Sequence, residues 1–85
     1  MEQKARHFAE EAIFALGRLD VATARTAIAQ AYDVDHKIGA LADAVYLACA
    51  DIENDDQVST ATWNTLADAV DSPELLAAIE LSRTA

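Results

Sequence analysis

The chain has 85 residues, about the length of one small domain, and its 15 acidic and 6 basic side chains give a formal net charge of −9. This balance disfavours direct binding to nucleic acid, which depends mostly on Lys and Arg contacts with phosphates. A single cysteine excludes an intrachain disulfide, and no Cys/His cluster has the spacing of a zinc site.

Helical spacing of apolar residues recurs along the chain, whereas Val, Ile and Thr form no alternating runs that would predict strands. We expect the first helix from Glu2 to Leu16, with an apolar stripe at i, i+3, i+4, i+7 spacing. Gly17 suits the left-handed position that follows a helix end. Asp20 is a suitable N-cap for a second helix, which ends near Asp33.

The third helix is expected from His36 to Asn54 and contains the most apolar run of the chain. Residues 38–50 hold one charge, Asp43, in thirteen positions. The run is too short to cross a membrane, which needs about 20 apolar residues, so we expect neighbouring helices to bury it on several sides. Gly39 lowers helix stability by roughly 1 kcal/mol relative to alanine, and we expect it to let another backbone approach closely.

Two further helices follow an acidic break. Either Ser59 or Thr60 can cap the fourth helix. Ser72 and Pro73 start the fifth, because serine is a preferred cap and the missing N–H of proline costs nothing in the first turn. This last helix fades over Ser82–Ala85.

These elements predict an all-α fold, a compact bundle of four to five short antiparallel helices in a single domain over residues 1–85. Short connections make sequential helices pack antiparallel. The N-terminal residues lack the apolar core of a signal peptide. We therefore expect a cytoplasmic protein that does not contact a membrane.

Several large apolar side chains fall off the stripes that face the predicted core. They are too many for a monomer of this size to hide easily, and 20 of the chain's residues are alanines, which bury little area. We therefore predict a homodimer or a complex with another protein. The candidate interface residues are Phe14, Tyr46, Leu47 and Leu81.

Two further interface candidates each have two interpretations. Trp63 either anchors the core or anchors an interface, where tryptophan is enriched. Asp43 lies about one turn from Leu47. It either faces solvent or makes a polar contact across an interface, because an enclosed carboxylate is costly unless it is paired.

An acidic patch follows the apolar run, in a stretch from 38 to 82 that has no Lys or Arg. It consists of Asp51, Glu53, Asp55 and Asp56. The first three resemble the opening of a calcium loop, but Asp56 and Thr62 stand where that loop needs glycine and glutamate. We expect a solvated patch, which either reflects compositional bias or meets a basic partner.

No arrangement of residues predicts catalysis, cofactor binding or a metal site. Cys49 lies on the buried stripe of the third helix and is interpreted as a core residue. His7 and His36 have carboxylates nearby in sequence but lack further ligands.

Two short segments resemble known helical motifs. Residues 26–35 resemble the first helix and turn of a helix-turn-helix DNA reader, but the helix that follows is the apolar run, with Lys37 as its only basic residue. A helix that reads a groove needs polar and basic side chains. Residues 9–34 resemble one tetratricopeptide-type hairpin, yet no second copy follows, and solenoids need about three repeats.

The sequence therefore predicts a small, acidic protein-interaction or regulatory module that is not an enzyme and acts through an apolar helix face and an acidic surface. The alternative is an acidic decoy that occupies a basic, nucleic-acid-binding surface of a partner protein. Salt distinguishes the two functions, because binding by a decoy weakens steeply as ionic strength rises.

Overall fold

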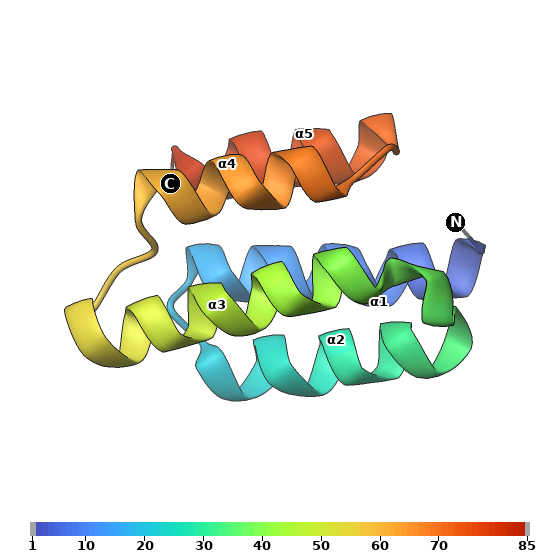
Figure 1. Cartoon of the computed structure of the whole chain (residues 1–85), viewed down its shortest axis with the longest axis horizontal. Coiled ribbons are helices and arrows are strands. Elements are labelled where there is room, and N and C mark those ends of the chain that lie inside the picture. The colour runs from blue at the N-terminus through green and yellow to red at the C-terminus, as the bar shows by residue number, and fades with distance from the viewer. Residues whose placement is uncertain (1, 85) are drawn as a thin grey trace.

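The computed structural model describes residues 2–84, which form five α-helices and one short 3₁₀ turn (Figure 1). Met1 and Ala85, the two ends of the predicted domain, lie outside the described residues. The elements are α1 (Gln3–Gly17), α2 (Val21–Val34), η1 (His36–Ile38), α3 (Gly39–Asp55), α4 (Thr60–Ala69) and α5 (Pro73–Arg83). No strand occurs within residues 2–84, so the predicted all-α bundle is confirmed.

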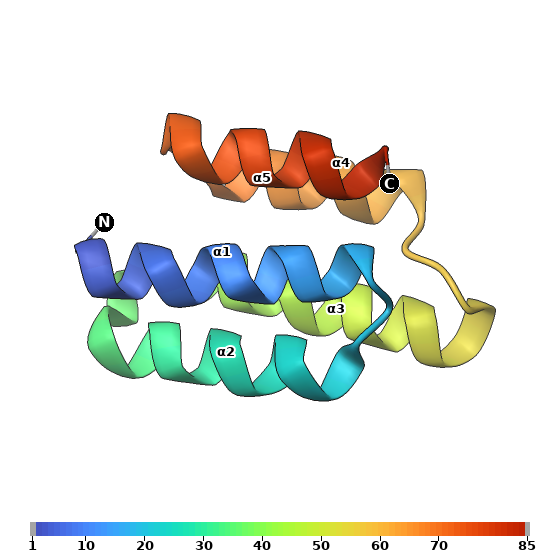
Figure 2. The same ribbon diagram turned by 180° about the vertical axis from the view of Figure 1, so that it is seen from behind.

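Helices α1, α2 and α3 pack together, and the hairpin of α4 and α5 covers their side opposite α2 (Figures 1 and 2). Consecutive helices run antiparallel, as predicted. Helix α4 contacts α3, and α5 contacts α1. Fully buried side chains come from all five helices, so one core joins the hairpin to the other three. The largest are Ile13, Leu16, Ile28, Leu41, Leu66, Leu75 and Ile79.

Two helices begin at caps that the sequence indicates. Asp20 Oδ1 accepts a hydrogen bond from the backbone N–H of Thr23 at 3.1 Å, and hydrogen bonding from Thr23 lowers the pKa of the Asp20 carboxyl. Ser59 Oγ accepts from the N–H of Thr62 at 3.1 Å. The cap of α4 is therefore Ser59 rather than Thr60, because its hydroxyl satisfies one of the free N–H groups of the first turn.

The predicted starts of the third and fifth helices differ in detail from those observed. Ser72 occupies the N-cap position before α5, but its hydroxyl donates to the carboxylate of Glu74 at 2.8 Å and makes no bond to the helix backbone. Asp35 Oδ1 accepts from the N–H of Lys37 at 3.0 Å, only two residues along. The third helix therefore starts as the tight turn η1 and becomes α-helical at Gly39.

The two glycines do not play the roles predicted for them. Gly17 is helical, and a Cβ at this position would lie 3.0 Å from the Cβ of Ser82 and 3.2 Å from its Cα. At Gly39 an added Cβ would meet no atom within 4 Å. Gly17 is therefore the position at which α5 approaches α1 closely. Helix α5 ends at Arg83, within the segment over which it was predicted to fade.

Leu19 takes the left-handed conformation that the sequence suggested for Gly17, with φ of 62°. The N–H of Leu19 bonds the carbonyl of Leu16 at 3.1 Å, and the N–H of Asp20 bonds the carbonyl of Ala15 at 2.9 Å. This pair of bonds is the Schellman motif, in which glycine is the preferred residue at the left-handed position. A leucine there carries a steric cost.

Replacing Leu19 with glycine is expected to stabilise the fold by about 0.5–1 kcal/mol, because relief of the left-handed strain exceeds the added flexibility of the unfolded chain. Little packing is lost, since the Leu19 side chain is 51% exposed. Urea denaturation followed by circular dichroism measures the change. Arg18→Gly is the matched control and should not stabilise, because Arg18 has φ of −91°. Destabilisation by Leu19→Gly would contradict the prediction.

Candidate interaction surface

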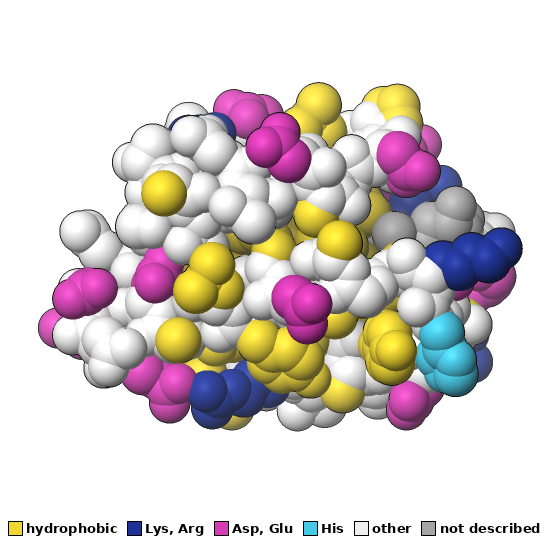
Figure 3. Space-filling view, in the orientation of Figure 1, with side chains coloured by type: hydrophobic (Ala, Val, Ile, Leu, Met, Phe, Trp, Pro, Cys, Tyr) yellow, Lys and Arg dark blue, Asp and Glu magenta, His cyan; other side chains and the backbone are white. Residues whose placement is uncertain are grey.

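Helix α3 carries a second apolar stripe on its outer side. Its buried stripe belongs to the core, and the helix contacts α2 and α4 and, less extensively, α1. The outer side remains open to solvent, and Tyr46 and Leu47 lie there with 42% and 47% of their surfaces exposed. Ala40 and Asp43, which precede them at helical spacing, are also exposed. Figure 3 shows apolar side chains gathered over α3 and α2 on this face of the molecule.

Asp43 is exposed and lies on this outer stripe, as the solvent-facing interpretation predicts for the single chain. Within residues 2–84 it has neither a hydrogen bond nor an ion pair, unlike Asp20 or Asp51. Its carboxylate is therefore free to meet a partner. Whether it does so across an interface stays a prediction.

A groove of about 430 Å³ separates the outer sides of α2 and α3. Tyr32 and Asp33 of α2 border it from one side, and Asp43 and Tyr46 of α3 border it from the other. The remaining lining is small and apolar, from Ala29, Gly39 and Ala42. The groove therefore combines two aromatic rings and two carboxylates around a lining without bulky side chains.

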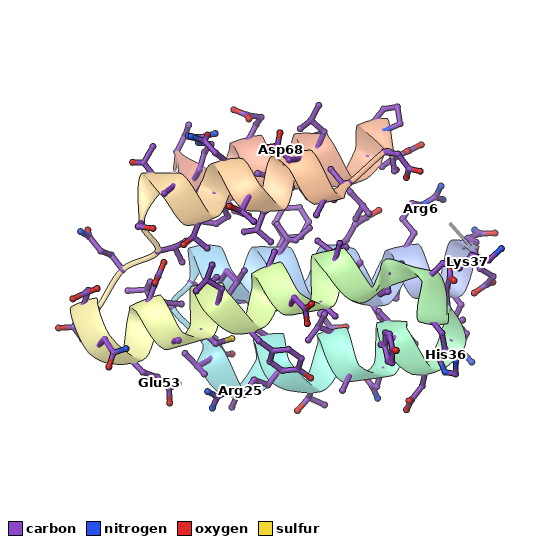
Figure 4. All side chains as sticks on the ribbon, viewed as in Figure 1. Arg6, Arg25, His36, Lys37, Glu53 and Asp68 are labelled. Carbon is purple, nitrogen blue, oxygen red and sulfur yellow. The ribbon has the colours of Figure 1, made fainter. Side chains whose placement is uncertain are left out.

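Charged side chains lie near both ends of this pair of helices (Figure 4). Arg25 of α2 donates to the carboxylate of Glu53 on α3, and both side chains are about half exposed. Exposed ion pairs of this kind contribute little stability, but this one neutralises Arg25. At the other end His36 stacks on Tyr32 with ring centroids 5.0 Å apart, and Lys37 follows it.

The predicted acidic patch divides into side chains with different roles. Asp51 Oδ2 accepts hydrogen bonds from Thr62 Oγ1 at 2.6 Å, from the N–H of Ser59 at 3.2 Å and from Ser59 Oγ at 3.1 Å. These bonds lower the pKa of the Asp51 carboxyl, and the bond from Thr62 has the largest effect. Asp51 is therefore not a solvated patch residue: it ties the end of α3 to the start of α4.

The other three carboxylates of the patch are exposed. Glu53 pairs with Arg25, as described above. Asp56 closes α3 in the left-handed conformation, with φ of 61° and its N–H bonded to the carbonyl of Ile52 at 2.9 Å. Asp55 is the last residue of α3. The patch therefore offers less free charge to a partner than its four carboxylates suggest.

The remaining interface candidates do not lie on the outer face of α3. Trp63 is only 8% exposed and packs in the core, so the core interpretation holds for this residue. Phe14 is 37% exposed on α1, and Leu81 is 64% exposed on α5. Helices α1 and α5 lie together on the opposite side of the bundle from the outer face of α3 (Figures 1 and 2).

Tyr32 and Asp33 are the surface residues that sequence reasoning missed. Tyr32 follows the buried Ala31 on α2, but it is itself 42% exposed. Because Tyr32 lies in the last full turn of α2, where the chain turns into η1, its ring packs on His36 rather than into the core. The i, i+3, i+4 spacing of Ala29, Tyr32 and Asp33 was the only available signal for a shared helix face.

Away from this surface, Cys49 has the surroundings of a core residue. Cys49 is completely buried, as predicted, and burial raises the pKa of its thiol, which disfavours the reactive thiolate. Within residues 2–84 no three His, Cys, Asp or Glu side chains are grouped so as to hold a metal ion. In the same part of the chain no helix has the length and apolarity to cross a membrane.

Comparison with known proteins adds no assignment. No family model, no curated protein and no solved structure matches the chain. The outer face of α3 and the groove beside it are therefore the candidate functional surfaces.

Proposed function

We propose that this protein is a non-catalytic interaction module that binds another protein through the outer face of α3. The observation that carries the proposal is the pair Tyr46 and Leu47, which are nearly half exposed on a helix whose other sides are packed. Covering such side chains removes apolar area from water, at about 25 cal/mol per Å². Tyrosine is also enriched among residues that dominate binding energy.

The partner is expected to present an apolar ridge with basic residues beside it. Asp43 lies within the apolar stripe, and the whole chain is strongly acidic, so a basic partner is attracted and an acidic one repelled. This proposal is favoured over the acidic decoy because two of the four patch carboxylates, Asp51 and Glu53, are engaged within the bundle. A decoy would rely on those charges being free.

A second copy of the chain fits the apolar part of this face, and the homodimer stays a prediction. A twofold dimer centred on Leu47 would bring the two Asp43 carboxylates near one another. Sedimentation equilibrium at high micromolar concentration tests it directly. A monomer under those conditions would count against a homodimer and leave a different protein as the partner.

Replacing Leu47 with aspartate is expected to weaken partner binding at least tenfold, since it places a charge in the desolvated centre of the interface. Cross-linked capture from cell extract, quantified by mass spectrometry, compares the wild type with the variant. Leu76→Asp is the matched control, because Leu76 is similarly exposed, at 43%, but lies on α5.

The expected result is a protein that the wild type and Leu76→Asp capture equally and Leu47→Asp does not. Circular dichroism must show that both variants remain helical. If both variants retain the same proteins, or both lose them together, the outer face of α3 is not the binding surface.

A further inference from the structure

We propose that the groove between α2 and α3 binds the guanidinium group of an arginine on a basic segment of the partner protein. This inference rests on the proposed function in one respect: Tyr46 belongs both to the groove and to the outer face of α3. A partner seated on Leu47 would therefore reach the groove with a neighbouring side chain.

The groove has the hydrogen-bond acceptors and aromatic surfaces that recognise a planar cation. The faces of aromatic rings attract cations, and Tyr32 and Tyr46 border the groove from opposite helices. Asp33 and Asp43 also stand on opposite helices, and neither has a hydrogen bond or ion pair among residues 2–84. A guanidinium both stacks on aromatic rings and donates in a fork to carboxylates, whereas an ammonium is a compact, strongly hydrated charge.

Small residues leave space for such a group. Ala29, Gly39 and Ala42 complete the lining, and even a Cβ added at Gly39 would meet no atom within 4 Å. The volume of about 430 Å³ lies within the range of ligand pockets, roughly 300–1,000 Å³. An arginine side chain can therefore enter without displacing the helices.

The charges around the groove argue against other occupants. An apolar group would bury two carboxylates without a partner, which is costly, and an anion would be repelled by both. Within residues 2–84 the basic side chains of the surrounding elements are Arg25, which pairs with Glu53, and His36 and Lys37 on η1. Among the residues that the structure describes, neither Asp33 nor Asp43 forms an ion pair that would fill the groove.

The probe is a short Gly/Ala peptide with one arginine, compared with the same peptide carrying citrulline, which keeps the shape and loses the charge. We expect titration of the ¹⁵N-labelled protein to shift the amide signals of Gly39, Ala42 and Asp43 in a saturable way. The citrulline peptide should bind at least fivefold more weakly, because the cation–π and ion-pair contributions are lost.

Two variants locate the effect. Asp43→Asn should weaken binding of the arginine peptide about threefold to tenfold, whereas Asp68→Asn removes the same charge from α4, away from the groove (Figure 4), and should change binding less than twofold. Tyr32→Leu keeps an apolar side chain and should weaken binding about twofold to fivefold. Asp43 and Asp68 are both exposed, so these two substitutions leave the fold intact.

Equal binding of the two peptides, shifts outside the groove, or equal effects of Asp43→Asn and Asp68→Asn would each overturn the inference. Leu47→Asp separates this result from the proposed function, because Leu47 does not line the groove. If the protein binds the arginine peptide but its capture of a partner does not depend on Leu47, only the proposed function is refuted. Leu47-dependent capture without arginine binding would refute only the groove.

Discussion

Replacing Leu66 with alanine is expected to lower the free energy of unfolding by about 3 kcal/mol. Leu66 lies on α4, is completely buried and belongs to the core that joins the α4–α5 hairpin to the other helices. Truncation removes apolar contacts and leaves a cavity. For a domain of this size the loss is a large share of the total stability, so Leu66→Val, expected to cost about 1 kcal/mol, provides a milder second variant.

Urea denaturation should be followed by both circular dichroism and the fluorescence of Trp63, the single tryptophan, which reports on α4. Because one core spans all five helices, the two probes should give the same midpoint in the wild type and in Leu66→Val. Leu81→Ala is the control and should cost less than about 1 kcal/mol, since Leu81 is 64% exposed. Separate transitions would mean that the hairpin unfolds as an independent unit.

Replacing Asp51 with alanine is expected to lower the free energy of unfolding by about 2 kcal/mol. Asp51 accepts hydrogen bonds from Thr62 and Ser59 at the start of α4, and Thr62 is only 3% exposed. The variant removes this charged acceptor from Thr62 and Ser59, and the buried Thr62 hydroxyl keeps only its 2.9 Å hydrogen bond with Ser59 Oγ. Thermal denaturation at pH 7 measures the loss, and a double-mutant cycle with Thr62→Val isolates the energy of the pair.

The same carboxylate makes stability depend on pH. The pKa of Asp51 is lowered in the folded state, so its contribution is complete above the unfolded pKa of about 4 and is lost as pH falls through the folded value. Asp51→Asn should therefore lose less stability than the wild type between about pH 5 and pH 2. Asp55→Asn is the control, because Asp55 is exposed on the same helix. If the free energy of unfolding of Asp51→Asn falls with decreasing pH as steeply as that of the wild type, Asp51 does not have this role.

The sequence by itself determined the features that depend on near neighbours in the chain. Capping by Asp20 and Ser59 and the placement of Pro73 in a first turn each involve groups within about three residues. Apolar periodicity placed the inner stripe of α3, including Cys49, in the core. The same periodicity placed Tyr46 and Leu47 off that stripe, where the structure exposes them.

Only the tertiary structure decided the features that join distant segments. The sequence predicted a close backbone approach at Gly39, but the packing of Ser82 places that approach at Gly17 and leaves Gly39 beside a groove. Asp51 looked like a solvated acid until α4 brought Thr62 to it. The groove itself requires Tyr32 and Tyr46 from different helices. Local propensity and periodicity place side chains around one helix axis, whereas packing determines which helix each side chain meets.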